Sequence, residues 1–227
     1  MLFVLGHMRS GSSLLVHILT SHKKIKGYGE THINYKDKKD FGFCAANICR
    51  YLRDFSIKEE YILDKVLHKW YLEDKTILSK ECVKVIFMLR SPDEALSSIV
   101  RNMDFVEGVD EAYQRYEKQI EWMQAMARRL PSRKWSYVTY SDLTQRTETV
   151  FSRLESLLGL DTPLPERYEK NRYTGTSGIG DPGPHIEAGY IKRNIDRKID
   201  PRVHPYLDQA EQKFKYCLRL LRKQSDL

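Results

Sequence analysis

Residues 5–15 read LGHMRSGSSLL and contain the residue types that bind phosphate groups. Gly6 and Gly11 stand in the Gly-x-x-x-x-Gly frame of a phosphate-binding loop, but Ser12 and Ser13 follow where a nucleotide-hydrolysing loop has Lys and then Ser or Thr. That lysine is the cation that reaches the β- and γ-phosphates of a triphosphate. What remains is a set of backbone N–H groups and four polar side chains: Arg9, Ser10, Ser12 and Ser13. We therefore expect a terminal phosphate or phosphosulfate in this loop, without a bound metal.

A second basic residue follows another apolar run. The stretch FMLRSPDEALSS places Arg90 after that run and Ser98 eight residues later, about two turns into a helix that Pro92 begins. This pair can bind a second, separate phosphate. Two anion sites indicate a nucleotide that is phosphorylated at two different places.

Alternating strands and helices must position these residues. Apolar runs predict strands at 2–5, 61–70 (with its exit), 83–89 and 135–143. Helical patterns predict helices at about 13–21, 41–55, 113–130, 150–158 and 204–223, and a further helix that begins at Pro92. The pattern is that of an α/β fold, a mainly parallel sheet flanked by helices, in a single domain over 1–227.

The carboxyl ends of parallel strands meet at one rim, which is where such folds bind ligands. We expect four segments at that rim: residues 6–13, the region after Trp70, residues 90–98 and residues 140–142. A long segment rich in Pro and Gly, at about 161–203, is expected to be a functional loop or lid.

Composition narrows the classes of protein. The net charge of +7 and the pI near 9.1 favour an anionic partner. Four cysteines without a C-x-x-C pair indicate neither a zinc site nor a disulfide framework. No apolar run approaches the roughly 20 residues that span a membrane, and the start of the chain does not resemble a secretion signal. We expect a cytoplasmic protein that binds neither membrane nor metal.

The ordered set of motifs resembles the sulfotransferases that use 3′-phosphoadenosine-5′-phosphosulfate (PAPS) and release adenosine 3′,5′-bisphosphate (PAP). RSGSS matches the loop that binds the 5′-phosphosulfate in that family, and Arg90 with Ser98 matches its 3′-phosphate segment. YSDL at 140–143 resembles the family's Y-E-D-L, and SGIGDP at 177–182 resembles a glycine-rich C-terminal loop. The resemblance implies a P-loop-like sulfotransferase fold and these cofactor-binding residues: Arg9, Ser10, Gly11, Ser12, Ser13, Arg90, Ser98, Gly178 and Gly180.

The resemblance also implies catalytic residues. Arg9 is expected at the bridging and sulfuryl oxygens. Glu30, in the stretch GYGETH, matches a glutamate that often follows the first helix and acts as general base, with His32 as the second candidate. His68 and Lys69 precede Arg90 by about the interval at which the family places a Lys or His beside the leaving group. The sequence departs from the family in the last cofactor loop, where no tryptophan follows Gly180.

The expected reaction is sulfuryl transfer to a hydroxyl or amine of a small molecule, such as a natural product, or of a sugar. Two alternatives stay open. A small-molecule or nucleotide kinase would need a magnesium carboxylate, for which the run YILD, ending at Asp64, is weak evidence. A basic nucleic-acid-binding module would need aromatic residues interleaved with basic ones, and no such motif is found.

Overall fold

The computed structural model describes residues 1–68, 71–72, 74–102, 106–171, 174–175, 185–195 and 198–225. Within them, five parallel strands form a sheet in the order β2-β3-β1-β4-β5. The strands are β1 (Leu2–Gly6), β2 (Ile25–Lys26), β3 (Tyr61–Val66), β4 (Lys84–Leu89) and β5 (Trp135–Thr139). The continuous apolar runs of β1 and β4 are explained by this arrangement, because a central parallel strand is covered on both faces. The predicted α/β fold with a parallel sheet is confirmed.

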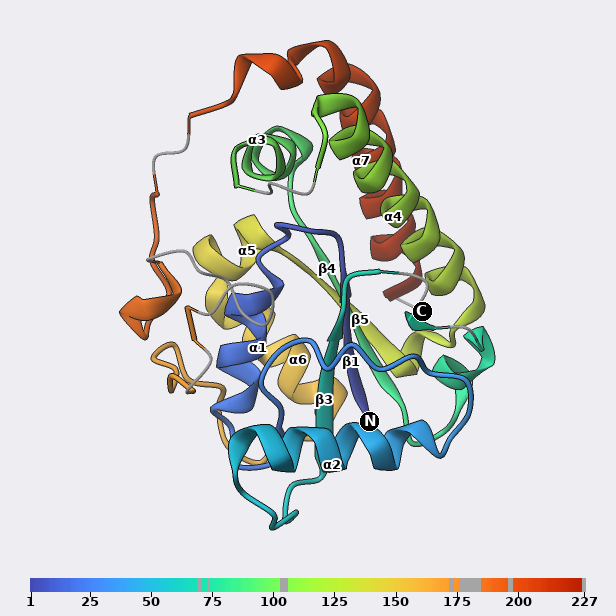
Figure 1. Ribbon diagram of the computed structural model, residues 1–227, viewed down its shortest axis with the longest axis vertical. Coiled ribbons are helices and arrows are strands. Elements are labelled where there is room, and N and C mark those ends of the chain that lie inside the picture. The colour runs from blue at the N-terminus through green and yellow to red at the C-terminus, as the bar shows by residue number, and fades with distance from the viewer. Residues whose placement is uncertain are drawn as a thin grey trace.

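Helices cover both faces of the sheet (Figure 1). One face packs through Val4, Ile86 and Met88 against α1 (Ser12–Thr20), α5 (Tyr140–Gln145) and α6 (Thr147–Leu158). The other face packs through Phe3 and Phe87 against α2 (Asp40–Leu52), α3 (Pro92–Asn102), α4 (Val109–Arg129) and α7 (His204–Ser225). Short 3-10 turns complete the description: η2 (Lys75–Ser79), η3 (Ser132–Lys134), η4 (Ile186–Ala188) and η5 (Pro201–Val203).

The register brings the carboxyl ends of four strands to one rim. Leu5 pairs with Val66 and Phe87, and Leu89 pairs with Thr139, so β1, β3, β4 and β5 end at similar heights. Each of these ends leads into a loop or helix that carries one of the predicted motifs. The rim is therefore the place to look for a functional site.

Two predicted strands are shorter in the structure. The strand predicted at 135–143 ends at Thr139, because the Thr139 hydroxyl accepts a hydrogen bond from the Asp142 N–H at 3.0 Å and caps α5. YSDL is thus the first turn of a helix. β3 ends at Val66, four residues before Trp70. The two-residue strand β2, at the edge of the sheet, was not predicted.

The segment after α6 forms hydrogen bonds with helices on both faces of the sheet. Tyr168 is buried and donates a hydrogen bond to the Ile186 carbonyl at 3.1 Å. Thr174 contacts His17 of α1, and the Asp200 N–H donates to the Ser97 hydroxyl of α3, each at 2.9 Å. Among the described residues, no helix is both long enough and apolar enough to pass through a lipid bilayer.

Candidate active site

The loop between β1 and α1 is shaped by two residues in the left-handed region. Arg9 has φ 59° and Gly11 has φ 91°. Gly11 is the N-cap of α1 and has no side chain to cap it, so the first N–H groups of the helix are left for an anion. Tyr140 packs directly on Gly11, since a Cβ there would lie 2.3 Å from the Tyr140 ring. Glycine is therefore required at this position by backbone conformation and by space.

His7 connects the loop between β1 and α1 to the end of β4. Its ring is buried; Nε2 accepts a hydrogen bond from the Arg90 N–H at 3.1 Å, which leaves Nδ1 to donate to the Met8 carbonyl at 2.8 Å. Burial lowers the pKa of His7 to about 4, so the ring is neutral at physiological pH. His7 thus joins the loop to the end of β4 and does not face a ligand.

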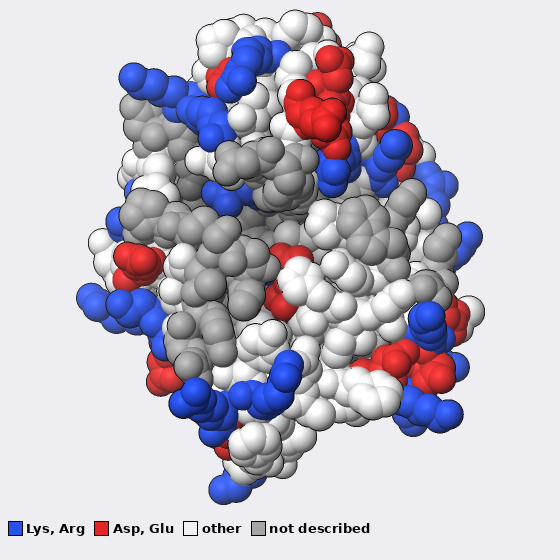
Figure 2. All heavy atoms as spheres, in the orientation of Figure 1, with Lys and Arg blue, Asp and Glu red and all other residues white. Residues whose placement is uncertain are grey.

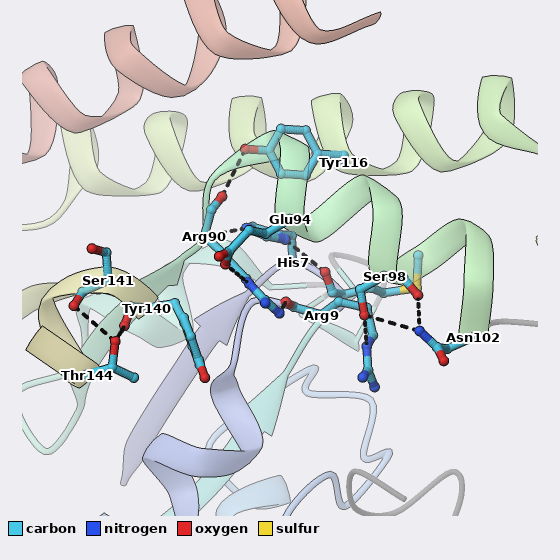
Figure 3. A network of polar contacts seen from close by, with 11 residues as sticks. His7, Arg9, Arg90, Glu94, Ser98, Asn102, Tyr116, Tyr140, Ser141 and Thr144 are labelled. Carbon is cyan, nitrogen blue, oxygen red and sulfur yellow. Dashed lines mark hydrogen bonds and ion pairs between the residues drawn. The ribbon is translucent and has the colours of Figure 1, made fainter. Parts of the chain in front are cut away.

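Arg90 and Arg9 are brought together with Ser98 (Figure 3). The Arg90 guanidinium donates to the Arg9 carbonyl at 3.0 Å and to Glu94 at 2.7 Å, and Nε of Arg9 donates to the Ser98 hydroxyl at 2.9 Å. The guanidinium of Arg90 also lies 4.5 Å from the centre of the Tyr140 ring. Arg9 therefore links the two motifs: its backbone carbonyl accepts from Arg90, and its guanidinium donates to Ser98. That Arg90 and Ser98 bind a phosphate stays a prediction.

These residues line a cavity of about 260 Å³. Gly11, Leu14 and Tyr140 also line the cavity, together with Ile186 and Tyr190 of the long segment. The cavity also contains two further cations that the sequence did not single out, Arg101 and Lys192. Its walls combine four cations and one carboxylate, Glu94, with apolar and aromatic surface, and the excess of positive charge suits a phosphorylated heterocycle.

A second polar group lies at the end of β3. Nζ of Lys65 is 3.1 Å from Glu30 Oε1 and 3.2 Å from the Ser13 hydroxyl, and the Lys65 side chain is only 3% exposed. Lys65 thereby connects the candidate base to the first turn of α1. Sequence reasoning missed Lys65, because the strand was predicted to run past it; the signal was the alternation of Asp64 and Lys65, which places them on opposite faces of a strand beside the loop.

The remaining predicted residues fall in different places. His32 is exposed, and its Nδ1 lies 3.2 Å from the Tyr71 hydroxyl. His68 also lies near Tyr71, with ring centres 6.2 Å apart, and burial lowers its pKa. Lys69, Gly178 and Gly180 lie outside the described residues.

The three loop serines differ in their surroundings. Ser12 begins α1, and Ser13 contacts Lys65. The Ser10 hydroxyl is buried beside Gly6 with no hydrogen-bond partner among the described residues, and the Ser10 N–H donates to the His7 carbonyl. This geometry does not favour direct contact of Ser10 with a ligand, so that contact stays a prediction.

Tyr140 is expected to stabilise the site measurably. We expect Tyr140→Leu to lower the free energy of unfolding by about 1 to 2 kcal/mol, because it removes a partly buried cation–π contact. Tyr216→Leu is the matched control, since Tyr216 is 46% exposed and Arg128 lies 5.9 Å from its ring. Urea denaturation measures both; equal losses would show that Tyr140 makes no special contribution.

Solved structures share this architecture. The sulfotransferase domain from the curacin biosynthetic pathway aligns over 94% of this chain and 96% of its own, with a TM-score of 0.67 and 17% sequence identity. The fold is that of a sulfotransferase domain. The sulfotransferase domain of the Synechococcus PCC 7002 olefin synthase agrees, over 95% of this chain and 94% of its own, with a TM-score of 0.60 and 18% identity. The sulfotransferase fold predicted from the motifs is thus confirmed.

Comparisons of sequence give little further information on the family of this protein. No protein-family model matches the chain. A stretch of 74 residues is 32% identical to the bifunctional IPC transferase and DIPP synthase of Aquifex aeolicus (strain VF5). That stretch covers 31% of this chain and 16% of the Aquifex protein, so the two are not alike over their whole lengths.

Proposed function

We propose that the protein is a PAPS-dependent sulfotransferase that acts on a hydroxyl or amine of a small molecule or sugar. One observation carries the proposal: two anion-binding groups, the N-terminus of α1 and the Arg9–Arg90–Ser98 set, lie on one rim and share one cavity. A nucleotide with phosphates at two separate positions is the ligand that uses both groups. The sulfotransferase fold supports the same reading.

The described residues fit PAPS. The N–H groups of α1, with Ser12 and Ser13, would hold the 5′ end, and Arg90, Ser98 and Arg9 would hold the 3′-phosphate. Leu14 and Ile186 supply apolar surface for the purine. PAPS, when bound, supplies an activated sulfuryl group.

Glu30 is proposed as the general base. Its carboxylate is held by Lys65, which also contacts Ser13, so the base and the anion-binding loop share one cation. Glu30 would take the proton of the acceptor, and Lys65 would stabilise negative charge on the oxygens nearest Ser13. His32 stays the second candidate for the base, and His68 or Lys69 stays the candidate for a group beside the leaving phosphate.

The kinase alternative is weakened by the two residues at the end of β3. A kinase needs a carboxylate near the loop hydroxyl to hold magnesium. Here the ammonium group of Lys65 lies beside Ser13, and Asp64 accepts hydrogen bonds from Thr31 and Tyr35 instead. The YILD run therefore does not supply the carboxylate that phosphoryl transfer would require at Ser13.

The nucleic-acid alternative finds little support on the face in Figure 2. There the Lys and Arg side chains form separate groups with Asp and Glu side chains between them. A nucleic-acid interface favours a continuous basic surface. That the protein binds no nucleic acid, no membrane and no metal, and acts in the cytoplasm on a natural product, stays a prediction.

Ligand-dependent stability tests the proposal. At 100 times its dissociation constant, PAP is expected to stabilise the protein by about 2.7 kcal/mol, which corresponds to a rise in Tm of about 5 to 10 °C. Thermal unfolding is measured with PAP, with ATP and magnesium, and with AMP. Protection by ATP and magnesium without protection by PAP would refute the proposal; a PAP-specific effect would justify an acceptor screen with sulfur-35-labelled PAPS.

A further inference from the structure

Asp64 is a buried carboxylate that holds a turn of the active site. Its side chain is 1% exposed and accepts three hydrogen bonds: from the Thr31 N–H at 2.9 Å, the Thr31 hydroxyl at 2.7 Å and the Tyr35 hydroxyl at 2.7 Å. Tyr35 is itself fully buried, with its ring edge-on to Phe3 of β1 at 5.0 Å. The carboxylate therefore connects Thr31 to the fixed core of the sheet.

The turn held in this way carries Glu30. Lys65, the next residue of β3, holds the same turn from the other face: its N–H donates to the Gly29 carbonyl at 3.1 Å, and its Nζ contacts Glu30. Two consecutive residues of one strand thus fix the residues on both sides of Glu30. Directly after Thr31 the chain turns through His32, whose φ is 56°.

Burying a carboxylate to hold a turn costs free energy, because the charge loses its contact with water. Burial raises the pKa of Asp64 to about 6, and the hydrogen bonds from Tyr35 and Thr31 act against that rise. An ionised carboxylate only accepts hydrogen bonds, so all three donors point at it and their directions are fixed. Such a group specifies one arrangement of the turn, because each alternative leaves a buried charge unsatisfied.

We propose that Asp64 is a positioning residue that acts through Thr31 to set the location of the Glu30 carboxylate. The role of Glu30 as base rests on the proposed function, but the holding of the turn does not. If Asp64 only stabilised the fold, its replacement would slow turnover solely because less of the protein would be folded. A positioning role lowers kcat in protein that is fully folded and still binds PAP.

Amide hydrogen exchange tests the holding of the turn without any assay of activity. In Asp64→Asn, one acceptor is replaced by a donor that faces two hydroxyl groups, and in Thr31→Val the side-chain donor is lost. We expect exchange of the Thr31 amide to become at least about tenfold faster in Asp64→Asn, with the amides of α1 unchanged. Asp200→Asn, which alters a carboxylate paired with Arg202, is the matched control and should leave the Thr31 amide unchanged. Unchanged exchange at Thr31 in Asp64→Asn overturns the proposal.

A double-mutant cycle with Glu30→Gln tests the catalytic consequence. We expect Asp64→Asn and Thr31→Val each to lower kcat by about 10- to 100-fold with the dissociation constant of PAP changed less than about twofold, while Thr31→Ser restores most of the rate. In the Glu30→Gln background, Asp64→Asn should cost less than about twofold, because the group it positions is already absent. An equal loss in both backgrounds would show that Asp64 does not act through Glu30. If the wild-type protein fails to bind PAP, the proposed function fails, and the exchange measurement still decides whether Asp64 holds the turn.

Discussion

Lys65→Met is expected to lower kcat by about 100- to 1000-fold, the range observed when one group that stabilises transition-state charge is removed. A single ammonium group contacts both Ser13 and Glu30, so its loss removes a cation beside the proposed anion-binding loop and leaves the proposed base without its ion-pair partner Lys65. Binding of PAP should weaken by less than about tenfold, because the N-terminus of α1 and Arg90 are unchanged. Steady-state kinetics with PAPS, together with calorimetric titration of PAP, separates the two effects.

Lys26→Met is the matched control for this variant. Lys26 is 4% exposed and forms an ion pair with Asp54, so it is as buried and as paired as Lys65, but it lies on the edge strand β2. We expect Lys26→Met to lose stability and to keep kcat within about threefold of the wild type. A comparable loss of kcat in both variants would show that burial of the lysine, and not its contact with Ser13 and Glu30, sets the rate.

Gly11→Ala is expected to weaken PAP binding by at least about 30-fold, which is about 2 kcal/mol. A non-glycine residue in the left-handed region costs about 1 to 2 kcal/mol, and the new methyl group would lie 2.3 Å from the Tyr140 ring. The loop or Tyr140 has to move, and either movement alters the cavity that the ring lines.

Gly42→Ala is the control for the glycine substitution. Gly42 lies in α2 with nothing within 4 Å of an added Cβ, so alanine there should be neutral or stabilising by up to about 1 kcal/mol. Isothermal titration with PAP and thermal unfolding are measured for both variants. Tight PAP binding by Gly11→Ala would mean that the loop holds no phosphate in the observed conformation.

The parts of the fold that follow from local pattern could be predicted from the sequence. The apolar run of β1, the glycine loop and the helix after it are adjacent in the chain, and Ser98 lies eight positions after Arg90, within the helix that Pro92 begins. The contacts that depend on where a strand ends could not be predicted in the same way. Lys65 lies beside Ser13 because β3 pairs with β1 in one particular register. In that register Leu5 pairs with Val66, which is 61 positions further along the chain.

The direction of the Arg9 side chain also could not be predicted from the sequence. Its left-handed backbone aims the guanidinium at Ser98, 89 residues further on, so a residue expected at the 5′ end of the nucleotide lies with the residues that we propose for the 3′ end. The prediction that the strand continues through YSDL was wrong for a related reason. The Thr139 hydroxyl accepts a hydrogen bond from the Asp142 N–H, so the strand ends there and a helix begins. In both cases a single backbone or capping feature outweighs the hydrophobic pattern.

The order of the strands has a consequence for synthesis on the ribosome. β1 is central in the sheet, and its neighbours β3 and β4 begin 55 and 78 positions after its last residue. Lys192, near the end of the chain, also lines the cavity. His17 of α1 bonds to Thr174, 157 residues further on, and Ser97 of α3 bonds to Asp200, 103 residues further on. A nascent chain released only as far as α6 therefore contains the loop proposed to bind phosphate but lacks residues that line the cavity. Ligand binding should appear late during translation, and until then the apolar strand β1 depends on other protection from aggregation.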